Sequence, residues 1–499
     1  MRRPGLLLLV VGLLAAVALV PAVAAPVAAG VRPTAAAAHV APRLVKPNIV
    51  YLLTDDEALD AFTHMPYVMS RRDWVSFSNS TVETSLCCPS RVTGLTGLYD
   101  THSGVTNNGN ASNYTGKDAL PCWLQGAGYA TGIFGKLHNG KGVHSPVDPC
   151  WTDYQVTVGT QIYGQYDYYL NDNGTVEWHG SAPQDYSVDL TERRAEHFID
   201  RSAATGQPFY VYYTPTATHA PWIASPTRRG SFSTAPVHDR PNVDEADRSD
   251  KPAWVRTLTP PSRSVMTTEQ RKTYAAALSV DDAIARLDAR LAADGLLSST
   301  VVVLATDNGY SFGSHDWVTK RCPYEECLQT PLMVRYPGQR ASVDAHAISN
   351  VDYAATIADI AGTVPATRTD GRSFLPFVLH PGLVDRSWPE TTLHHWAGGD
   401  VDDDGGTVRA IPQFWAVRSA DRYVYVELDT GEREFYDLAV DPYELHNDIR
   451  TRSYAPVIAR ARRELAARKV QADAGPATAP DAPTNRNVPG SQTELPDLD

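Results

Sequence analysis

The chain has no long run of basic residues, and its formal net charge is −13 at pH 7. Proteins that bind nucleic acid through its phosphates usually present a basic face, so we expect no nucleic-acid partner. The one long apolar stretch, residues 6–20, is shorter than the roughly 20 residues that a membrane-spanning helix needs. Apolar residues make up 43% and charged residues 20% of the 499, which is ordinary for a large globular protein.

The N-terminus has the pattern of a secretory signal peptide. Arg2 and Arg3 precede the apolar stretch, and small residues follow it at 22–24. This is the order of the charged, apolar and cleavage regions of an export signal. A retained N-terminal anchor is the alternative. We expect a secreted protein, extracellular or in the cell envelope, with no membrane span in its mature form.

Cysteine is scarce, with six residues in the whole chain. Cys87 and Cys88 are adjacent, and neighbouring cysteines rarely pair because the bond is strained. In an exported protein the other four are expected to form disulfides. The economical pairing is Cys122 with Cys150 and Cys322 with Cys327.

Short apolar runs typical of buried strands alternate with helical patterns. Such an alternation predicts an α/β fold in which helices cover both faces of a large mixed, mainly parallel sheet. The runs lie at 48–53, 131–134, 209–213 and 300–305, and helical patterns lie at 191–201 and 268–295.

The composition changes after about residue 385. Alternating runs at 414–418, 423–428 and 433–437 predict a small antiparallel sheet, and a helix is expected at 455–470. The expected division is a signal peptide at 1–25, an unstructured leader at 26–46, a catalytic domain at 47–385, a C-terminal antiparallel subdomain at 386–471 and a disordered tail at 472–499.

Polar residues follow each predicted strand of the main sheet, at the edge where open parallel sheets bind ligands. The acidic residues and the amide among them offer only oxygen atoms and three negative charges, which suits a hard divalent cation. Their alternative role is to form turns after the strands. The residues are Asp55 and Asp56, Lys136 and His138, His219, and Asp307 and Asn308.

The segment from Cys87 to Gly97 carries the most specific pattern. Pro89 is placed as a first helical residue, so backbone N–H groups and Arg91 could meet an anion at a helix N-terminus beside a reactive thiol. The sequence C-x-P-S-R followed by L-T-G resembles the signature of the formylglycine-dependent sulfatases. Further segments resemble the same family in its order, at 48–56, 135–138, 307–310, 324–325, 330–334, 435–438 and 441–445.

The chain resembles two branches of that family. The doubled cysteine and the segments 279–282 and 307–310 look most like the branch that acts on N-acetylglucosamine 6-sulfate. His138 instead matches the arylsulfatase branch. The tyrosines at 163, 166, 168 and 169 with Trp178 could stack on sugar rings, although packing at a loop-rich edge also explains them. The substrate thus stays open between carbohydrate and aryl sulfates.

The resemblance implies an alkaline phosphatase-like fold and hydrolysis of sulfate esters with release of inorganic sulfate. It implies that a formylglycine-generating enzyme oxidises Cys87, while Cys88 is a small buried side chain. One hydroxyl of the hydrated aldehyde would attack sulfur, and the other would then expel sulfate. The implied calcium ligands are Asp55, Asp56, Asp307, Asn308 and the modified Cys87.

The resemblance also implies roles for the basic residues. Arg91 would hold the formylglycine hydroxyl, and Lys136 would contact both sulfate and formylglycine. His138 would remove the proton of the second hydroxyl, and His219 or Lys320 would protonate the leaving oxygen. His315 could contact the substrate.

Two other functions are compatible with parts of the sequence. A phosphonate monoester hydrolase or phosphodiesterase of the same superfamily could also carry formylglycine. A secreted, non-catalytic protein that binds sulfated glycans belongs to a different class, and the intact set of motif residues argues against it.

Overall fold

The computed structural model describes residues 42–399, 410–420 and 422–474. The predicted signal peptide at 1–25 lies outside the described residues, as do 26–41 of the predicted leader and 475–499 of the predicted tail. The last part of the leader is tied to the main body, because Arg43 forms an ion pair of 2.6 Å with Asp359. No helix among the described residues is long and apolar enough to cross a membrane.

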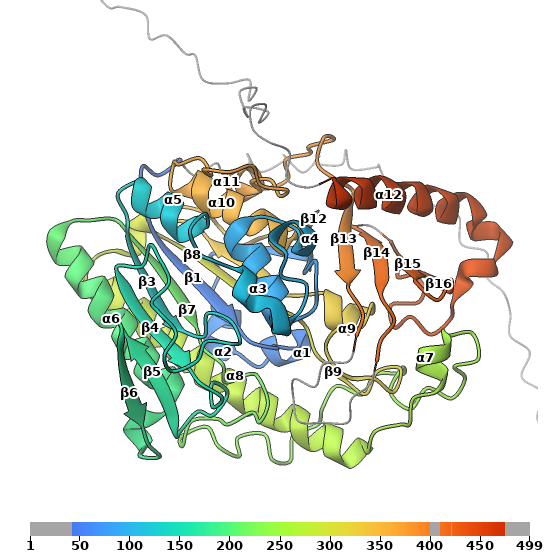
Figure 1. The fold of residues 1–499 in the computed structure, drawn as a ribbon, viewed down its shortest axis with the longest axis horizontal. Coiled ribbons are helices and arrows are strands. Elements are labelled where there is room, and N and C mark those ends of the chain that lie inside the picture. Colours follow the sequence, from blue (N-terminus) through green and yellow to red (C-terminus); the bar gives the residue numbers. More distant parts are fainter. Residues whose placement is uncertain (1–41, 400–409, 421, 475–499) are drawn as a thin grey trace, which may run out of the picture. The chain divides into compact units, whose positions relative to one another are not determined.

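A ten-stranded sheet forms the centre of the main body (Figure 1). Its strand order is β12-β2-β11-β8-β1-β7-β3-β4-β5-β6, and only β11 and β5 run antiparallel to their neighbours on both sides. The strands are β1 (Asn48–Thr54), β2 (Trp74–Thr81), β3 (Ala130–Gly135), β4 (Asp153–Val158), β5 (Tyr168–Asp172), β6 (Thr175–His179), β7 (Phe209–Thr214), β8 (Thr300–Thr306), β11 (Leu332–Arg335) and β12 (Ser342–Ser349).

The four predicted strands are confirmed as β8, β1, β7 and β3, which are neighbours at the centre of this sheet. Side chains of β1 alternate between two separate apolar cores, with Tyr51 in one and Leu52 in the other. Because both faces are buried, these strands are apolar throughout and could be recognised from sequence.

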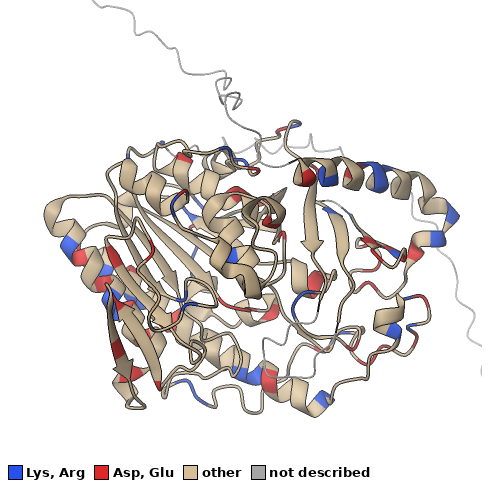
Figure 2. Ribbon diagram, in the orientation of Figure 1, with Lys and Arg blue, Asp and Glu red and all other residues tan. Residues whose placement is uncertain are grey.

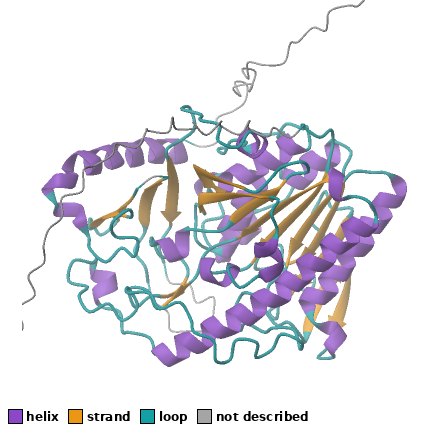
Figure 3. Ribbon diagram, turned by 180° about the vertical axis from the view of Figure 1, so that it is seen from behind, coloured by secondary structure: helices purple, strands orange, loops and turns teal. Residues whose placement is uncertain are grey.

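Helices cover both faces of the sheet, as predicted. Residues of α3, α5, α10 and α11 form one apolar core, and residues of α6 and α8 form the other, where the long helix α8 crosses the sheet (Figure 3). The helices are α1 (Leu59–Phe62), α2 (Pro66–Ser70), α3 (Cys87–Thr96), α4 (Asp100–Ser103), α5 (Leu120–Gly126), α6 (Ser187–Thr205), α7 (Ala253–Arg256), α8 (Arg263–Ala293), α9 (Glu325–Leu328), α10 (Tyr353–Ile360), α11 (Leu375–Leu379) and α12 (Ala455–Asp473).

A separate antiparallel sheet of four strands follows, in the order β13-β14-β15-β16. Its strands are β13 (Thr391–Trp396), β14 (Phe414–Ser419), β15 (Tyr423–Leu428) and β16 (Arg433–Asp437). The last three and α12 were expected from the sequence, whereas β13 was not. Leu465 of α12 and Val417 of β14 belong to one apolar cluster. Lysines and arginines gather along this helix (Figure 2).

Both expected disulfides are present. Cys122 is bonded to Cys150, and Cys322 to Cys327. Cys87 and Cys88 are free thiols and both are buried. The pairing deduced by setting the adjacent cysteines aside is therefore confirmed.

Removing the Cys122–Cys150 bond should destabilise the protein more than removing Cys322–Cys327. The first closes 28 residues and the second five, so loop-closure entropy predicts losses of about 3–4 and about 2 kcal/mol. Paired Cys→Ala variants, compared by urea denaturation, measure both losses. A larger loss from the shorter loop would show that local packing, rather than chain entropy, dominates.

Candidate active site

Helix α3 brings Cys87 and Arg91 to the carboxyl edge of the main sheet. The helix begins at Cys87, after Leu86 in an extended conformation, and ends at Gly97, whose φ is 69°. Pro89 is therefore the third helical residue rather than the first, still within the turn whose N–H groups need no helical partner. All ten residues of α3 are buried.

The predicted acidic residues meet next to the thiol of Cys87. Because β1 and β8 are parallel neighbours, Asp55 and Asp56 come beside Asp307 and Asn308. The backbone N–H of Asp56 donates to Asp307 Oδ1 at 3.0 Å, and Asn308 Nδ2 donates to Asp56 Oδ1 at 2.7 Å. Cys87 Sγ lies 3.6 Å from Asp55 Oδ1 and 3.8 Å from Asp56 Oδ1.

Three basic side chains face these three carboxylates. Arg91 Nε lies 2.7 Å from Asp307 Oδ2, and Lys136 Nζ lies 2.8 Å from Asp55 Oδ2. Lys320 Nζ lies 2.7 Å from Asp56 Oδ2 and 3.2 Å from Cys87 Sγ. All six charged groups are buried, so water is largely excluded from the site. The three positive charges formally balance the three negative charges.

These pairings decide which groups are ionised. Burial alone would raise the pKa of Asp55, but Lys136 and Arg91 outweigh it and hold the pKa well below its usual range. Burial and the charge of Asp55 raise the pKa of Asp307 to about 6. Burial also raises the pKa of the Cys87 thiol. Because thiolates and not thiols are nucleophiles, an unmodified Cys87 is poorly suited to attack sulfur.

His138 is a neutral base whose second ring nitrogen has no hydrogen-bond partner in the described part of the chain. Its Nδ1 is 2.6 Å from the carbonyl oxygen of Asn139, so this nitrogen carries the proton. Burial lowers the pKa of His138 to about 4. Its Nε2 is buried and has no hydrogen-bond partner among the described residues, which leaves it able to accept a proton.

His219 and Lys320 are brought together, although 101 residues separate them in the chain. Lys320 Nζ lies 3.3 Å from His219 Nε2, which also lies 3.2 Å from Asp56 Oδ2. Lys320 follows the short hairpin of β9 (Ser311–Phe312) and β10 (Val318–Thr319). Burial lowers the pKa of His219.

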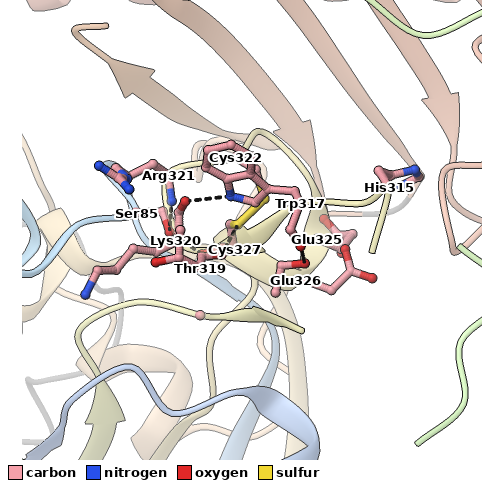
Figure 4. The surroundings of a disulfide bond; sticks show 12 residues. Ser85, His315, Trp317, Thr319, Lys320, Arg321, Cys322, Glu325, Glu326 and Cys327 are labelled. Atoms are coloured by element: carbon pink, nitrogen blue, oxygen red, sulfur yellow. Dashed lines mark hydrogen bonds between the residues drawn. A yellow bond between two sulfur atoms is a disulfide. The ribbon is translucent and has the colours of Figure 1, made fainter. Parts of the chain in front are cut away.

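His315 is not among the residues gathered around Cys87. It and the ammonium group of Lys320 point to opposite sides of the Cys322–Cys327 disulfide (Figure 4). His315 Nδ1 lies 2.6 Å from Glu245 Oε2, and its Nε2 lies 3.3 Å from Asn242 Nδ2. The contact with substrate suggested by the sequence thus has no support in this arrangement.

Glu326 and Glu444 lie close to His315 and form with it a second group with metal-ligand atoms. Asn242 Nδ2 already donates to Glu326 Oε1 at 2.9 Å while facing His315 Nε2. These side chains therefore belong to a buried hydrogen-bonded network.

The acidic residues near Cys87 fit a cation better. Asp55, Asp56 and Asp307 supply carboxylate oxygens, and Asn308 Oδ1 is buried without a hydrogen-bond partner among the described residues. These four residues offer only oxygen atoms and three negative charges, which suits calcium. Cys87 Sγ and His219 Nε2 lie within 4.8 Å of the ligand atoms of Asp55 and Asp56. The four residues with oxygen ligands are those that could hold the expected ion.

The sequence interpretation missed the role of one tyrosine. Tyr168 is fully buried and Tyr169 packs on Trp178, so packing explains both. Tyr163 instead stacks on His219, with ring centroids 3.6 Å apart, and accepts a hydrogen bond from Lys136. No sequence motif contains Tyr163, and the strands on either side of it, β4 and β5, were not predicted, so no signal in the sequence pointed to this role.

Family models match almost the whole described chain. The Sulfatase model matches residues 47–363, and the model for the C-terminal part of N-sulphoglucosamine sulphohydrolase matches 313–471. The N-acetylglucosamine-6-sulfatase of Homo sapiens is 31% identical over 81% of this chain and 81% of its own length. The arylsulfatase of Volvox carteri is 31% identical over 83% and 72%.

A longer relative is matched only in part. The extracellular sulfatase SULF-1 homolog of Drosophila melanogaster is 31% identical over 71% of this chain, but the match spans 33% of that relative. The rest of the Drosophila protein lies outside the match.

Solved structures share the fold. A protein in complex with its substrate D-glucosamine-2-N,6-O-disulfate has a TM-score of 0.76 at 23% identity, covering 86% of this chain and 98% of its own. The phosphonate monoester hydrolase of Agrobacterium radiobacter has a TM-score of 0.66 at 19% identity, covering 87% and 100%. With family models and relatives across its length, the chain belongs to the sulfatase family and is a sulfuric ester hydrolase.

Proposed function

We propose that the protein is an exported, calcium-dependent sulfatase whose nucleophile is formylglycine made from Cys87. The observation that carries this proposal is the convergence on Cys87 Sγ of Asp55, Asp56 and Lys320, at 3.6, 3.8 and 3.2 Å. The sulfur of Cys87 stands where the reactive oxygen atoms of formylglycine would be. When hydrated, formylglycine supplies one hydroxyl that attacks sulfur and a second that allows sulfate to leave.

Arg91, Asp307 and Lys136 prepare the site for the sulfate group. Arg91 Nη1 donates to the carbonyl oxygen of Lys136 at 2.8 Å, while its Nε binds Asp307. These bonds hold the guanidinium group in place, and Asp55 Oδ2 holds the Lys136 ammonium group at 2.8 Å. Little reorganisation is therefore needed when charge develops on sulfate oxygens. Calcium, held by the four acidic and amide residues, would add positive charge there.

His219 and Lys320 serve the leaving oxygen. Lys320 Nζ lies 2.7 Å from Asp56 Oδ2 and 3.3 Å from His219 Nε2, so the two nitrogen atoms face the same part of the site. One of the two donates a proton to the departing alcohol, which avoids an unstable alkoxide. The neutral Nε2 of His138 is suited to the opposite task, removing a proton from the second hydroxyl.

The substrate is proposed to be a sulfated carbohydrate or aryl sulfate. Relatives named as N-acetylglucosamine-6-sulfatases and arylsulfatases match to the same extent. His315 is left out of the proposed substrate contacts. The proposed division into domains remains that of the sequence, with a catalytic part at 47–385 and a C-terminal part at 386–471.

Maturation must precede folding in this proposal. Cys87 is completely buried, so a formylglycine-generating enzyme could not reach it in the folded chain. Export is proposed from the signal pattern at 1–25. Extracellular relatives such as the Drosophila protein agree with this location.

Turnover of 4-nitrophenyl sulfate and 4-nitrophenyl phosphate by the same preparation separates the proposed function from its superfamily alternative. We expect kcat/KM for the sulfate to exceed that for the phosphate monoester by at least about 100-fold, or about 2.7 kcal/mol in transition-state binding. The phosphonate monoester 4-nitrophenyl phenylphosphonate completes the set. A preference for either phosphorus ester would make the phosphonate hydrolase the better description.

A further inference from the structure

Tyr163 contacts two groups of the active site from one side. It lies in the loop between β4 and β5 and is partly buried. Its hydroxyl accepts hydrogen bonds from Lys136 Nζ at 3.1 Å and Asn139 Nδ2 at 2.6 Å. Its ring stacks on that of His219 with an angle of 6° between the planes.

The hydroxyl restrains Lys136. A lysine side chain loses considerable rotamer freedom when it is ordered, and two fixed acceptors, Asp55 and Tyr163, hold its ammonium group here. Lys136 Nζ also lies 4.6 Å from the centroid of the Tyr163 ring, within the range of a cation–π contact. Because the phenol is neutral, it positions Lys136 without cancelling its charge.

The ring restrains His219 in a second direction. His219 Nδ1 lies 2.7 Å from the carbonyl oxygen of Ala220, which fixes one edge of the imidazole. Stacking on Tyr163 prevents the ring from tilting about that edge. The hydrogen bond to Ala220 and the stacking on Tyr163 together direct His219 Nε2 towards Lys320 and Asp56.

We propose that Tyr163 is a positioning residue for sulfate ester hydrolysis, with its hydroxyl holding Lys136 and its ring holding His219. This inference rests on the proposed function, since it takes Lys136 to bind sulfate and His219 to act at the leaving oxygen. The two parts of the side chain thereby have separable effects.

Two substitutions separate the hydroxyl from the ring. Tyr163→Phe keeps the stacked ring and removes the hydroxyl, so KM should rise about tenfold with kcat within about twofold, as for the loss of one hydrogen bond to a charged group. Tyr163→Leu removes both, so kcat should also fall, by about 10- to 100-fold. The fall should be larger for phenyl sulfate than for 4-nitrophenyl sulfate, because the poorer leaving group depends more on protonation.

Tyr67 supplies matched controls. Its hydroxyl also accepts from a cation, Arg71 Nη1 at 2.9 Å, and it is partly buried like Tyr163, but its other partner is Asp288 of α8. Tyr67→Phe and Tyr67→Leu should lower thermal stability without changing the ratio of rates on the two sulfates. Equal kinetic losses in Tyr163→Phe and Tyr163→Leu, or wild-type kinetics in both, would overturn the proposal.

One further substitution covers the case in which Tyr163→Leu folds poorly. Tyr163→Trp, which keeps a flat ring, should restore most of kcat. The losses of Tyr163→Leu and His219→Ala should be non-additive, with the double variant little worse than His219→Ala alone. Additive losses would contradict positioning through His219. Wild-type protein bearing formylglycine but inactive on both sulfates would instead refute the proposed function.

Discussion

Cys87→Ala should abolish sulfate ester hydrolysis, by at least about 10⁴-fold in kcat, whereas Cys88→Ala should keep it. Cys87 faces Asp55, Asp56 and Lys320. The sulfur of Cys88 belongs to the apolar core instead and accepts a hydrogen bond from the backbone N–H of Asn139 at 3.1 Å. Removing it should cost on the order of 1 kcal/mol of stability. Aryl sulfate turnover and urea denaturation of both variants test this.

Mass spectrometry shows whether the difference in activity between the Cys87 and Cys88 variants arises from formylglycine. In protein made with the modifying enzyme, the peptide containing residues 87 and 88 should carry an aldehyde at Cys87 and a thiol at Cys88. Cys88→Ala provides the matched control, since it should still be modified. Fully active protein with an unmodified Cys87 thiol would end this mechanism.

Chelation should reduce turnover by at least about 100-fold, and added calcium should restore it. Without the ion, the positive charge on Arg91, Lys136 and Lys320 only balances the three carboxylates, so little attraction for the sulfate group remains. Thermal stability should also fall, although the same ion pairs should limit that loss. Full activity after exhaustive chelation, with no metal found by elemental analysis, would mean that these residues only form turns.

Asp307→Ala should lose most activity even at saturating calcium. Asp307 binds Arg91 Nε at 2.7 Å and accepts from the backbone of Asp56 at 3.0 Å, so its removal disturbs both the acidic set and the guanidinium. Asp288→Ala is the control, because Asp288 is also buried and paired with an arginine, Arg335, but lies on α8. Both variants should be less stable, and only Asp307→Ala should lose its response to calcium.

Much of the site could be predicted because its residues directly follow parallel strands that are buried on both faces. The central strands β1, β3, β7 and β8 are buried on both faces, so each is a continuous apolar run. Parallel neighbours end at the same edge, which places the residues after them together. The resemblance to the sulfatase family supplied the rest, including the motif around Cys87 and the role expected of Lys320.

Other strands escaped prediction because their sequences lack that signal. All six residues of β13 are buried, yet Thr391, Thr392, His394 and His395 are among them. His394 binds the carbonyl oxygen of Val82, so a polar strand is stabilised by partners about 300 residues away in the chain. Hydrophobic periodicity cannot detect such a strand.

The sequence by itself determined the four central strands of the main sheet, the disulfides and most of the residues that gather around Cys87. Only the tertiary structure decided that His315 belongs to a different buried network and that Tyr163 touches both Lys136 and His219. The physical reason is the distance along the chain over which each feature is decided. Burial of a strand and the direction of its end follow from a few adjacent residues, whereas a contact between two loops depends on how the intervening elements pack.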